Sequence, residues 1–186
     1  MITELQLQNF KCFKQSPVFE FSKINLLTGV NGRGKSTLLQ SILLLTQSVW
    51  KNRVFRKLHI NGDLVELGNF DDIKNSETPR GKDIRFHIKT NIKDIEQVIF
   101  SFREDQSDSL VATISEIALK RQNENLEYHD NSVPLRHTDP KYLNSWNAFQ
   151  RMFIYIYYVS AERAGPVKYV DKTYQPDSHN EAESII

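Results

Sequence analysis

Residues 29–37 contain the feature that most constrains the fold of this chain, the segment Gly29-Val30-Asn31-Gly32-Arg33-Gly34-Lys35-Ser36-Thr37. It matches the phosphate-binding pattern Gly-x-x-x-x-Gly-Lys-Ser, known as the P-loop. Gly29 and Gly34 permit backbone angles that a side chain would forbid, so the amides between them can turn inward around a β-phosphate. We expect Lys35 to reach the β- and γ-phosphates and the Ser36 hydroxyl to bind Mg²⁺.

The sequence on both sides of this loop fits the motif. Lys23 to Thr28 contains the apolar run Ile24-Asn25-Leu26-Leu27, which predicts a short strand entering the loop. Apolar residues then recur at helical spacing, at Leu38, Leu39, Ile42, Leu43, Leu45 and Val49. A chance glycine turn before a helix is the alternative, but strand, loop and helix together favour phosphate binding at the helix N-terminus.

The nucleotide contacts that this motif predicts come from one continuous segment. Lys35 is the predicted catalytic residue, whereas Arg33 is expected to face solvent and Asn31 to shape the loop. The predicted nucleotide-binding residues are Asn31, Gly32, Arg33, Gly34, Lys35, Ser36 and Thr37. The predicted cofactors are therefore ATP and Mg²⁺.

Composition narrows the class of protein and its environment. The 186 residues are 39% hydrophobic and 25% charged, which is typical of a soluble globular protein. A net charge of +1 argues neither for nor against nucleic acid. The single cysteine, Cys12, excludes an internal disulfide and fits a reducing compartment. The apolar run Met152–Val159 is too short to span a bilayer, so we expect a cytoplasmic protein without membrane attachment.

The segment before the P-loop predicts two antiparallel strands. Leu5 and Leu7 alternate with polar neighbours over residues 1–10, which indicates a half-buried strand. Val18, Phe19 and Phe21 suggest a second strand after a turn at residues 9–14. Kinase-like and GTPase-like P-loop proteins usually carry the P-loop on their first strand, so this order indicates a different P-loop arrangement.

The run Leu5-x-Leu7-x-Asn9-Phe10-Lys11-Cys12-Phe13, with a P-loop about twenty residues later, resembles the N-terminal end of cassette-type ATPases of the RecF, structural-maintenance-of-chromosomes and OLD groups. In those families the chain before the P-loop packs near the adenine and ribose. The resemblance therefore makes Lys11, Cys12 and Phe13 candidates for base or ribose contacts. The alternative places Phe10 and Phe13 in the core and Lys11 in solvent.

Residues 60–128 predict a β-rich lobe that contains one candidate metal ligand. Alternation over 84–88, 98–102 and 110–128 indicates antiparallel strands. Cassette ATPases carry a metal-binding glutamine in a loop of this region, and no glutamine stands at residues 64–73. The pattern Leu67-Gly68-x-Phe70-x-Asp72 resembles the equivalent loop of OLD-like ATPases. The resemblance makes Asn69 to Asp72 candidate substitutes for that glutamine, with Asp71 as a candidate Mg²⁺ ligand. An ordinary polar turn is the alternative.

The C-terminal part predicts a helix that begins near Pro140 and a buried strand over 153–159. Glu162 follows that strand, but we reject a Walker B role because Ser160 stands where the metal-binding aspartate belongs. Ser160-Ala161-Glu162-Arg163-x-Gly165-Pro166 instead resembles a segment that closes the first half of OLD-like and RecF-like heads. A cluster of basic residues at 51–57 suits either phosphate contacts or a helix C-terminus.

Together these features predict an α/β P-loop NTPase, a cassette-type head with an N-terminal antiparallel β-lobe and a partial mixed core sheet. Residues 1–170 would form the N-terminal part of one head, and 171–186 a tail leading to a missing C-terminal half. The subdivisions are 1–28 (antiparallel strands), 29–50 (P-loop and helix), 60–128 (β-rich lobe) and 140–166 (helix and core strand). The signature motif, Walker B pair and switch histidine of cassette ATPases do not occur in these 186 residues.

The resemblance implies an ATP-hydrolysing head that pairs with a second copy of itself around nucleotide and gates a DNA-directed activity. Such proteins act in antiphage defence or DNA repair, with a nuclease or toxin effector and DNA as partners. A non-catalytic module that uses nucleotide to hold an assembly together is the first alternative. A P-loop kinase is the second, and the strands before the P-loop argue against it.

Overall fold

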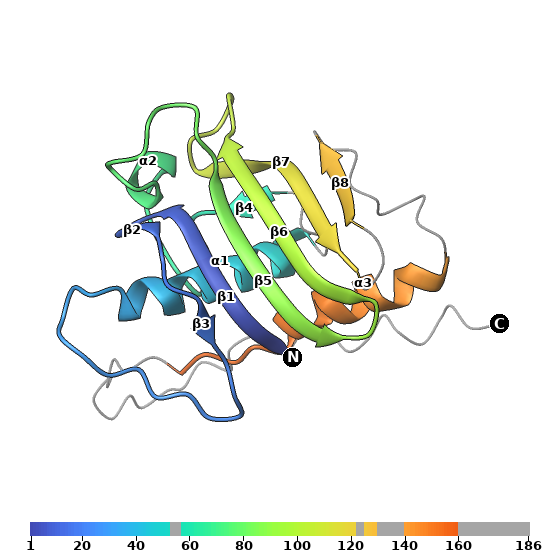
Figure 1. The fold of residues 1–186 in the computed structure, drawn as a ribbon. Coiled ribbons are helices and arrows are strands. Elements are labelled where there is room, and N and C mark those ends of the chain that lie inside the picture. The colour runs from blue at the N-terminus through green and yellow to red at the C-terminus, as the bar shows by residue number, and fades with distance from the viewer. Residues whose placement is uncertain (53–56, 122–124, 130–139, 160–186) are drawn as a thin grey trace, which may run out of the picture.

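The computed structural model describes residues 1–52, 57–121, 125–129 and 140–159. Its main feature is one eight-stranded sheet in which every strand pair is antiparallel. The sheet runs in the order β2-β1-β5-β6-β7-β4, with β3 also paired to β1 and β8 to β7. Figure 1 shows α1 and α3 together behind this sheet. The strands are β1 (Ile2–Phe10), β2 (Phe13–Gln15), β3 (Phe19–Glu20), β4 (Lys57–His59), β5 (Ile84–Ile92), β6 (Ile95–Glu104), β7 (Val111–Lys120) and β8 (Asn125–His129).

Strand β1 joins the segment before the P-loop to the rest of the sheet. It pairs with β2 and β3 along one edge and with β5 along the other. Leu5 and Leu7 are buried and their polar neighbours are partly exposed, which confirms the predicted half-buried strand. The predicted second strand is present as the short β3. The N-terminal strands and the lobe over 60–128 are therefore parts of one sheet.

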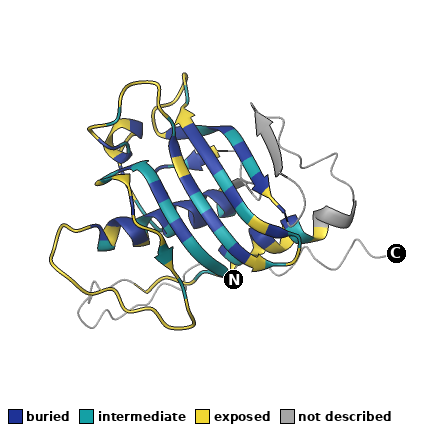
Figure 2. Ribbon diagram, viewed as in Figure 1, coloured by how far each residue is buried: buried dark blue, intermediate teal, exposed yellow. Residues whose placement is uncertain are grey.

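One face of the sheet holds the core, and its aromatic side chains form a continuous cluster. Phe86 lies 5.3 Å from Phe10 and 5.7 Å from Phe102, measured between ring centroids. Phe100 lies 6.0 Å from Phe149 of α3 (Pro140–Ile154), which begins at the predicted proline. Figure 2 shows buried residues alternating with partly exposed ones along β1, β5 and β6, as the period-two pattern predicts.

Helix α1 (Lys35–Asn52) confirms the helix predicted after the P-loop. Its last turns are fastened to the segment after it by buried polar side chains. Gln47 donates from Nε2 to the His59 carbonyl at 2.6 Å and accepts from the Val65 amide at 3.0 Å. Ser48 accepts from the His59 amide at 2.9 Å. These bonds hold α1 against β4, so the end of the helix far from the P-loop is fixed to the sheet.

Two predicted strands are absent from the described residues. Ile24 and Leu26 are 89% and 86% exposed, and no strand forms at 23–28. Residues 153–159 are likewise no strand, because α3 continues through Ile154 and Phe153 packs on Phe149 at 5.6 Å. A buried strand needs strand neighbours on its edges, and no described strand pairs with either segment. The partial mixed sheet therefore stays a prediction.

Candidate nucleotide-binding site

The P-loop adopts the backbone conformation that its glycines were expected to supply. Gly29, Gly32 and Gly34 have φ values of +131°, +79° and +94°, in the region that L-residues rarely enter. Helix α1 begins at Lys35, directly after the last glycine, and its Leu38 amide donates to the Gly34 carbonyl at 2.9 Å. The loop therefore leads straight into a helix N-terminus, whose free amides and dipole favour an anion.

Lys35 organises the loop from within. Its ammonium donates to the carbonyls of Gly29 and Val30, with Nζ–O distances of 2.7 and 2.9 Å. These bonds curl the start of the loop around the lysine. An ammonium has three N–H donors, so one remains for a phosphate oxygen while the other two hold the loop. The Lys35 ammonium therefore lies against the loop that the sequence predicts to bind phosphate.

Ser36 and Thr37 divide two roles between them. Ser36 is exposed at the first turn of α1, where its hydroxyl is available to a metal ion. Thr37 is buried, and its Oγ1 accepts from the Cys12 thiol with an Sγ–O distance of 3.5 Å. Of the two, only Ser36 is exposed, and its binding of Mg²⁺ stays a prediction. The threonine ties α1 to the turn between β1 and β2.

The remaining loop residues leave room for a ligand. Asn31, Gly32 and Arg33 are exposed, in agreement with the solvent-facing position expected for Arg33. A Cβ placed on Gly29 or Gly32 would have no heavy atom within 4 Å. Open backbone of this kind lets a phosphate approach the amides closely. The loop, Lys35 and Ser36 thus fit a nucleotide phosphate chain.

Mg²⁺ also fits this arrangement. Among the described residues, no group of three or more His, Cys, Asp or Glu side chains could hold a metal ion. Mg²⁺ does not need such a cage at a phosphate site, because it keeps several waters and takes one or two protein oxygens together with phosphate oxygens. Ser36 would supply the protein oxygen, and the metal would neutralise charge on the phosphates.

Of the predicted residues, Cys12 and Phe13 contact the P-loop segment, whereas Lys11 bonds to Ile73 and Asn75. Cys12 contacts Thr37, and the Phe13 ring lies against Gly34. Phe10 is fully buried in the core, and Phe13 is partly buried at its edge. The interpretation of Phe10 as a core residue is therefore confirmed, and Phe13 in the turn after it touches the phosphate loop. A contact to base or ribose stays a prediction.

Helix α2 (Phe70–Ile73) explains the sequence around Asp71 in local terms. Asn69 caps the helix by accepting from the Asp72 amide at 3.2 Å, and Asp72 accepts from the Asn69 amide at 2.8 Å. This reciprocal pair is a capping box, so Asp72 is engaged in local structure. Asp71 is exposed, and its role as a metal ligand stays a prediction.

Sequence reasoning missed the contribution of Asn9 and Asn75. Asn9 has a φ of +59°, and its Nδ2 donates to the Asp83 carbonyl at 2.7 Å. Asn75 donates from Nδ2 to the Lys11 carbonyl, also at 2.7 Å. Asparagine tolerates left-handed backbone and bonds neighbouring peptides, so the Asn9-Phe10-Lys11 sequence carried a weak signal for this turn. The sequence around Asn75 contains no pattern that predicts its contact with Lys11, 64 positions earlier in the chain.

A glycine-rich loop with its lysine, the exposed serine after it and an 18-residue helix define a P-loop nucleotide-binding domain. Residues 1–182 match the family model described as AAA ATPase domain, and the chain belongs to this family. P-loop NTPases of this kind have an α/β fold. The described residues contribute one large sheet and few helices to it. None of the helices in the described ranges is long and apolar enough to cross a bilayer.

A curated relative supports the same class. The chain is 28% identical over 123 residues to a Helicobacter pylori (strain ATCC 700392 / 26695) protein named ATP/GTP phosphatase. The aligned region covers 66% of this chain and 30% of that protein. The chain thus spans less than a third of the length of this relative.

Proposed function

We propose that this chain forms the N-terminal part of an ATPase head that binds ATP with Mg²⁺ and hydrolyses it together with the rest of a longer protein. The observation that carries the proposal is the geometry of Lys35, the first residue of α1. Its ammonium donates to the Gly29 and Val30 carbonyls of the loop. The short alignment on the longer relative supports the larger size of the complete protein.

The loop amides, Lys35 and Ser36 have distinct roles in this proposal. The loop amides and the N-terminus of α1 hold the β-phosphate, and Lys35 places positive charge beside the β- and γ-phosphates, where it stabilises the charge of the transition state. Ser36 holds Mg²⁺ through its hydroxyl. The relative's name mentions both ATP and GTP. We propose ATP for this chain, with GTP as the competitor to measure.

The finer proposal is a cassette-type head of the OLD/RecF kind. Its support is the pair of short strands, β2 and β3, on the outer edge of β1, which puts antiparallel strands before the P-loop. Such a head would pair with a second copy around ATP and gate a DNA-directed activity in defence or repair. A nuclease or toxin effector and DNA are the partners that this version proposes.

Lys35→Ala in the full-length protein tests the proposal. We expect ATP turnover to fall by about a hundredfold or more, because the lost ammonium stabilises developing phosphate charge. Lys23→Ala is the matched control, since this exposed lysine precedes the loop and lies outside the predicted nucleotide-binding residues; its turnover should stay within about threefold of wild type, a difference of under 1 kcal/mol.

Three results would change the assignment. Equal turnover in Lys35→Ala and wild type would contradict catalysis at this loop. ATP-dependent association without any phosphate release by wild type would favour the non-catalytic assembly module. Transfer of the γ-phosphate to an acceptor instead of water would favour a kinase.

A further inference from the structure

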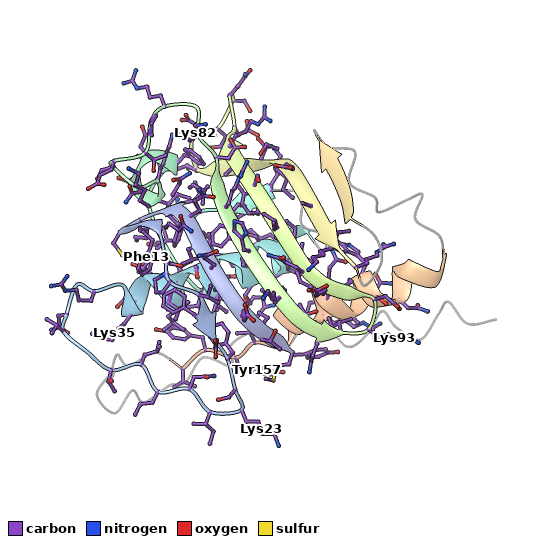
Figure 3. The ribbon with its side chains drawn as sticks, viewed as in Figure 1. Phe13, Lys23, Lys35, Lys82, Lys93 and Tyr157 are labelled. Atoms are coloured by element: carbon purple, nitrogen blue, oxygen red, sulfur yellow. The ribbon has the colours of Figure 1, made fainter. Side chains whose placement is uncertain are left out.

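The ring of Phe13 lies with its tip against the last glycine of the P-loop. A Cβ built on Gly34 would overlap Cζ of Phe13 and lie 2.9 Å from Cε2 and 3.0 Å from Cε1. Figure 3 labels Phe13, from β2, and Lys35, from the start of α1. Because the ring fills the space where a side chain would stand, it limits how far the Gly34 backbone can move toward β2.

Phe13 is itself held by the sheet. It opens β2 and pairs with Phe10 of β1. Its ring makes an edge-to-face contact with Phe19 of β3, with centroids 5.8 Å apart. Such aromatic pairs contribute about 0.5–1.5 kcal/mol beyond the area they bury. The position of the ring is therefore set by three strands and not by the P-loop.

The turn that carries Phe13 is fixed a second time, by residues 73–78. Lys11 has a φ of +49°, and its amide donates to the Ile73 carbonyl at 2.7 Å. The Asn75 side chain donates to the Lys11 carbonyl at 2.7 Å, and the Asn75 amide donates to the Asn9 carbonyl at 3.0 Å. We call this set of bonds the turn clamp. It holds the β1–β2 turn in a conformation that its residues would not adopt alone.

We propose that Phe13 is a positioning residue for phosphate binding. Its ring holds Gly34 at a φ of +94°. The next residue is Lys35, so a displaced Gly34 also displaces the ammonium and the first amides of α1. The proposal rests on phosphate binding at the P-loop, and it assigns Phe13 to the loop instead of to the adenine or ribose.

Positioning and base contact make different predictions for different ligands. A residue that shapes the phosphate loop affects every ligand that carries the phosphates, with or without a base. A residue that stacks on adenine affects ATP alone. Inorganic triphosphate carries the phosphate chain without the nucleoside, so comparing it with ATP separates the two roles.

The experiment measures binding of Mg²⁺–ATP and Mg²⁺–triphosphate to the full-length protein by titration calorimetry. For Phe13→Leu we expect both affinities to fall by the same factor, about tenfold or more, because small displacements of binding groups are costly. For Phe13→Tyr we expect the same direction of change, because the added hydroxyl sits on Cζ, the atom that faces Gly34. Phe21→Leu is the control, a partly buried phenylalanine packed on the core before the loop; both affinities should match wild type.

The outcomes distinguish the inference from the function on which it rests. Loss of ATP affinity with unchanged triphosphate affinity, or full affinity in Phe13→Tyr, would overturn the positioning role in favour of a base contact. Unchanged affinities in both variants would overturn it outright. Failure of wild type to bind either ligand would instead contradict the proposed function. Circular dichroism melts of each variant give the folded fraction by which the affinities are corrected.

Discussion

At the scale of single residues, the site depends on the contact between Gly34 and the ring of Phe13. Gly34 needs a positive φ for the loop, and it also leaves the space that the Phe13 ring fills. Gly32 has a positive φ as well, but no atom lies within 4 Å of the position a Cβ would take. A side chain at Gly32 would therefore cause backbone strain alone, whereas a side chain at Gly34 would cause backbone strain and a collision with the Phe13 ring.

This difference predicts unequal effects of two similar substitutions. Gly32→Ala introduces strain alone, which costs on the order of 1–3 kcal/mol. Gly34→Ala adds a collision with the Phe13 ring, so we expect a larger loss in the free energy of unfolding, measured by urea denaturation. Adding Phe13→Leu to Gly34→Ala should recover part of that loss. Equal destabilisation by the two alanines would show that the ring does not press on Gly34.

At the scale of elements, the turn clamp joins the β1–β2 turn, which lies beside the P-loop, to the end of α2 and the segment after it. Asn75 is buried and bonds the Lys11 carbonyl, the Glu77 amide and the Thr78 hydroxyl. Gln47 similarly fixes the other end of α1 to residues 59–65. The helix behind the phosphate site is thus fixed near both of its ends, which favours a preorganised loop.

Asn75→Ala tests the clamp. The part-buried Lys11 carbonyl, the Glu77 amide and the Thr78 hydroxyl would lose the Asn75 side chain as a partner. An unsatisfied buried group costs about 1–3 kcal/mol. We expect a loss of that size in the free energy of unfolding, with a smaller loss of ATP affinity than in Phe13→Leu, because the Lys11 amide keeps its bond to Ile73. Glu77→Ala is the control at an exposed neighbour. If the Asn75→Ala and Glu77→Ala variants had the same free energy of unfolding, the clamp would not contribute to stability.

The sequence predicted those elements whose determinants are local. The Gly-rich motif predicted the loop, and the spacing of Leu38, Leu45 and Val49 predicted α1. Period-two alternation predicted β1, β5 and β6 in the same way. The turn clamp escaped prediction because it joins Asn9 and Lys11 to residues more than sixty positions away. The ring contact at Gly34 escaped for the same reason.

At the scale of the whole molecule, the two wrong strand predictions share a cause. The segments around Leu26 and Tyr157 are apolar enough for buried strands, yet Leu26 is 86% and Tyr157 88% exposed. Apolar content allows a segment to form a buried strand, but the strand forms only where a neighbouring strand supplies its backbone hydrogen bonds. The described residues supply one antiparallel sheet, and its pairs do not include either segment.

The central claim is that the P-loop of this chain binds the phosphates of ATP through Lys35. Its most direct test is a calorimetric titration of Mg²⁺–ATP into full-length wild-type protein and the Lys35→Ala variant. We predict saturation at one ATP per chain for wild type, and binding weakened by at least about tenfold in the variant, which corresponds to a loss of about 1.4 kcal/mol. Equal affinity in the two proteins, or no binding by correctly folded wild type, would contradict the claim.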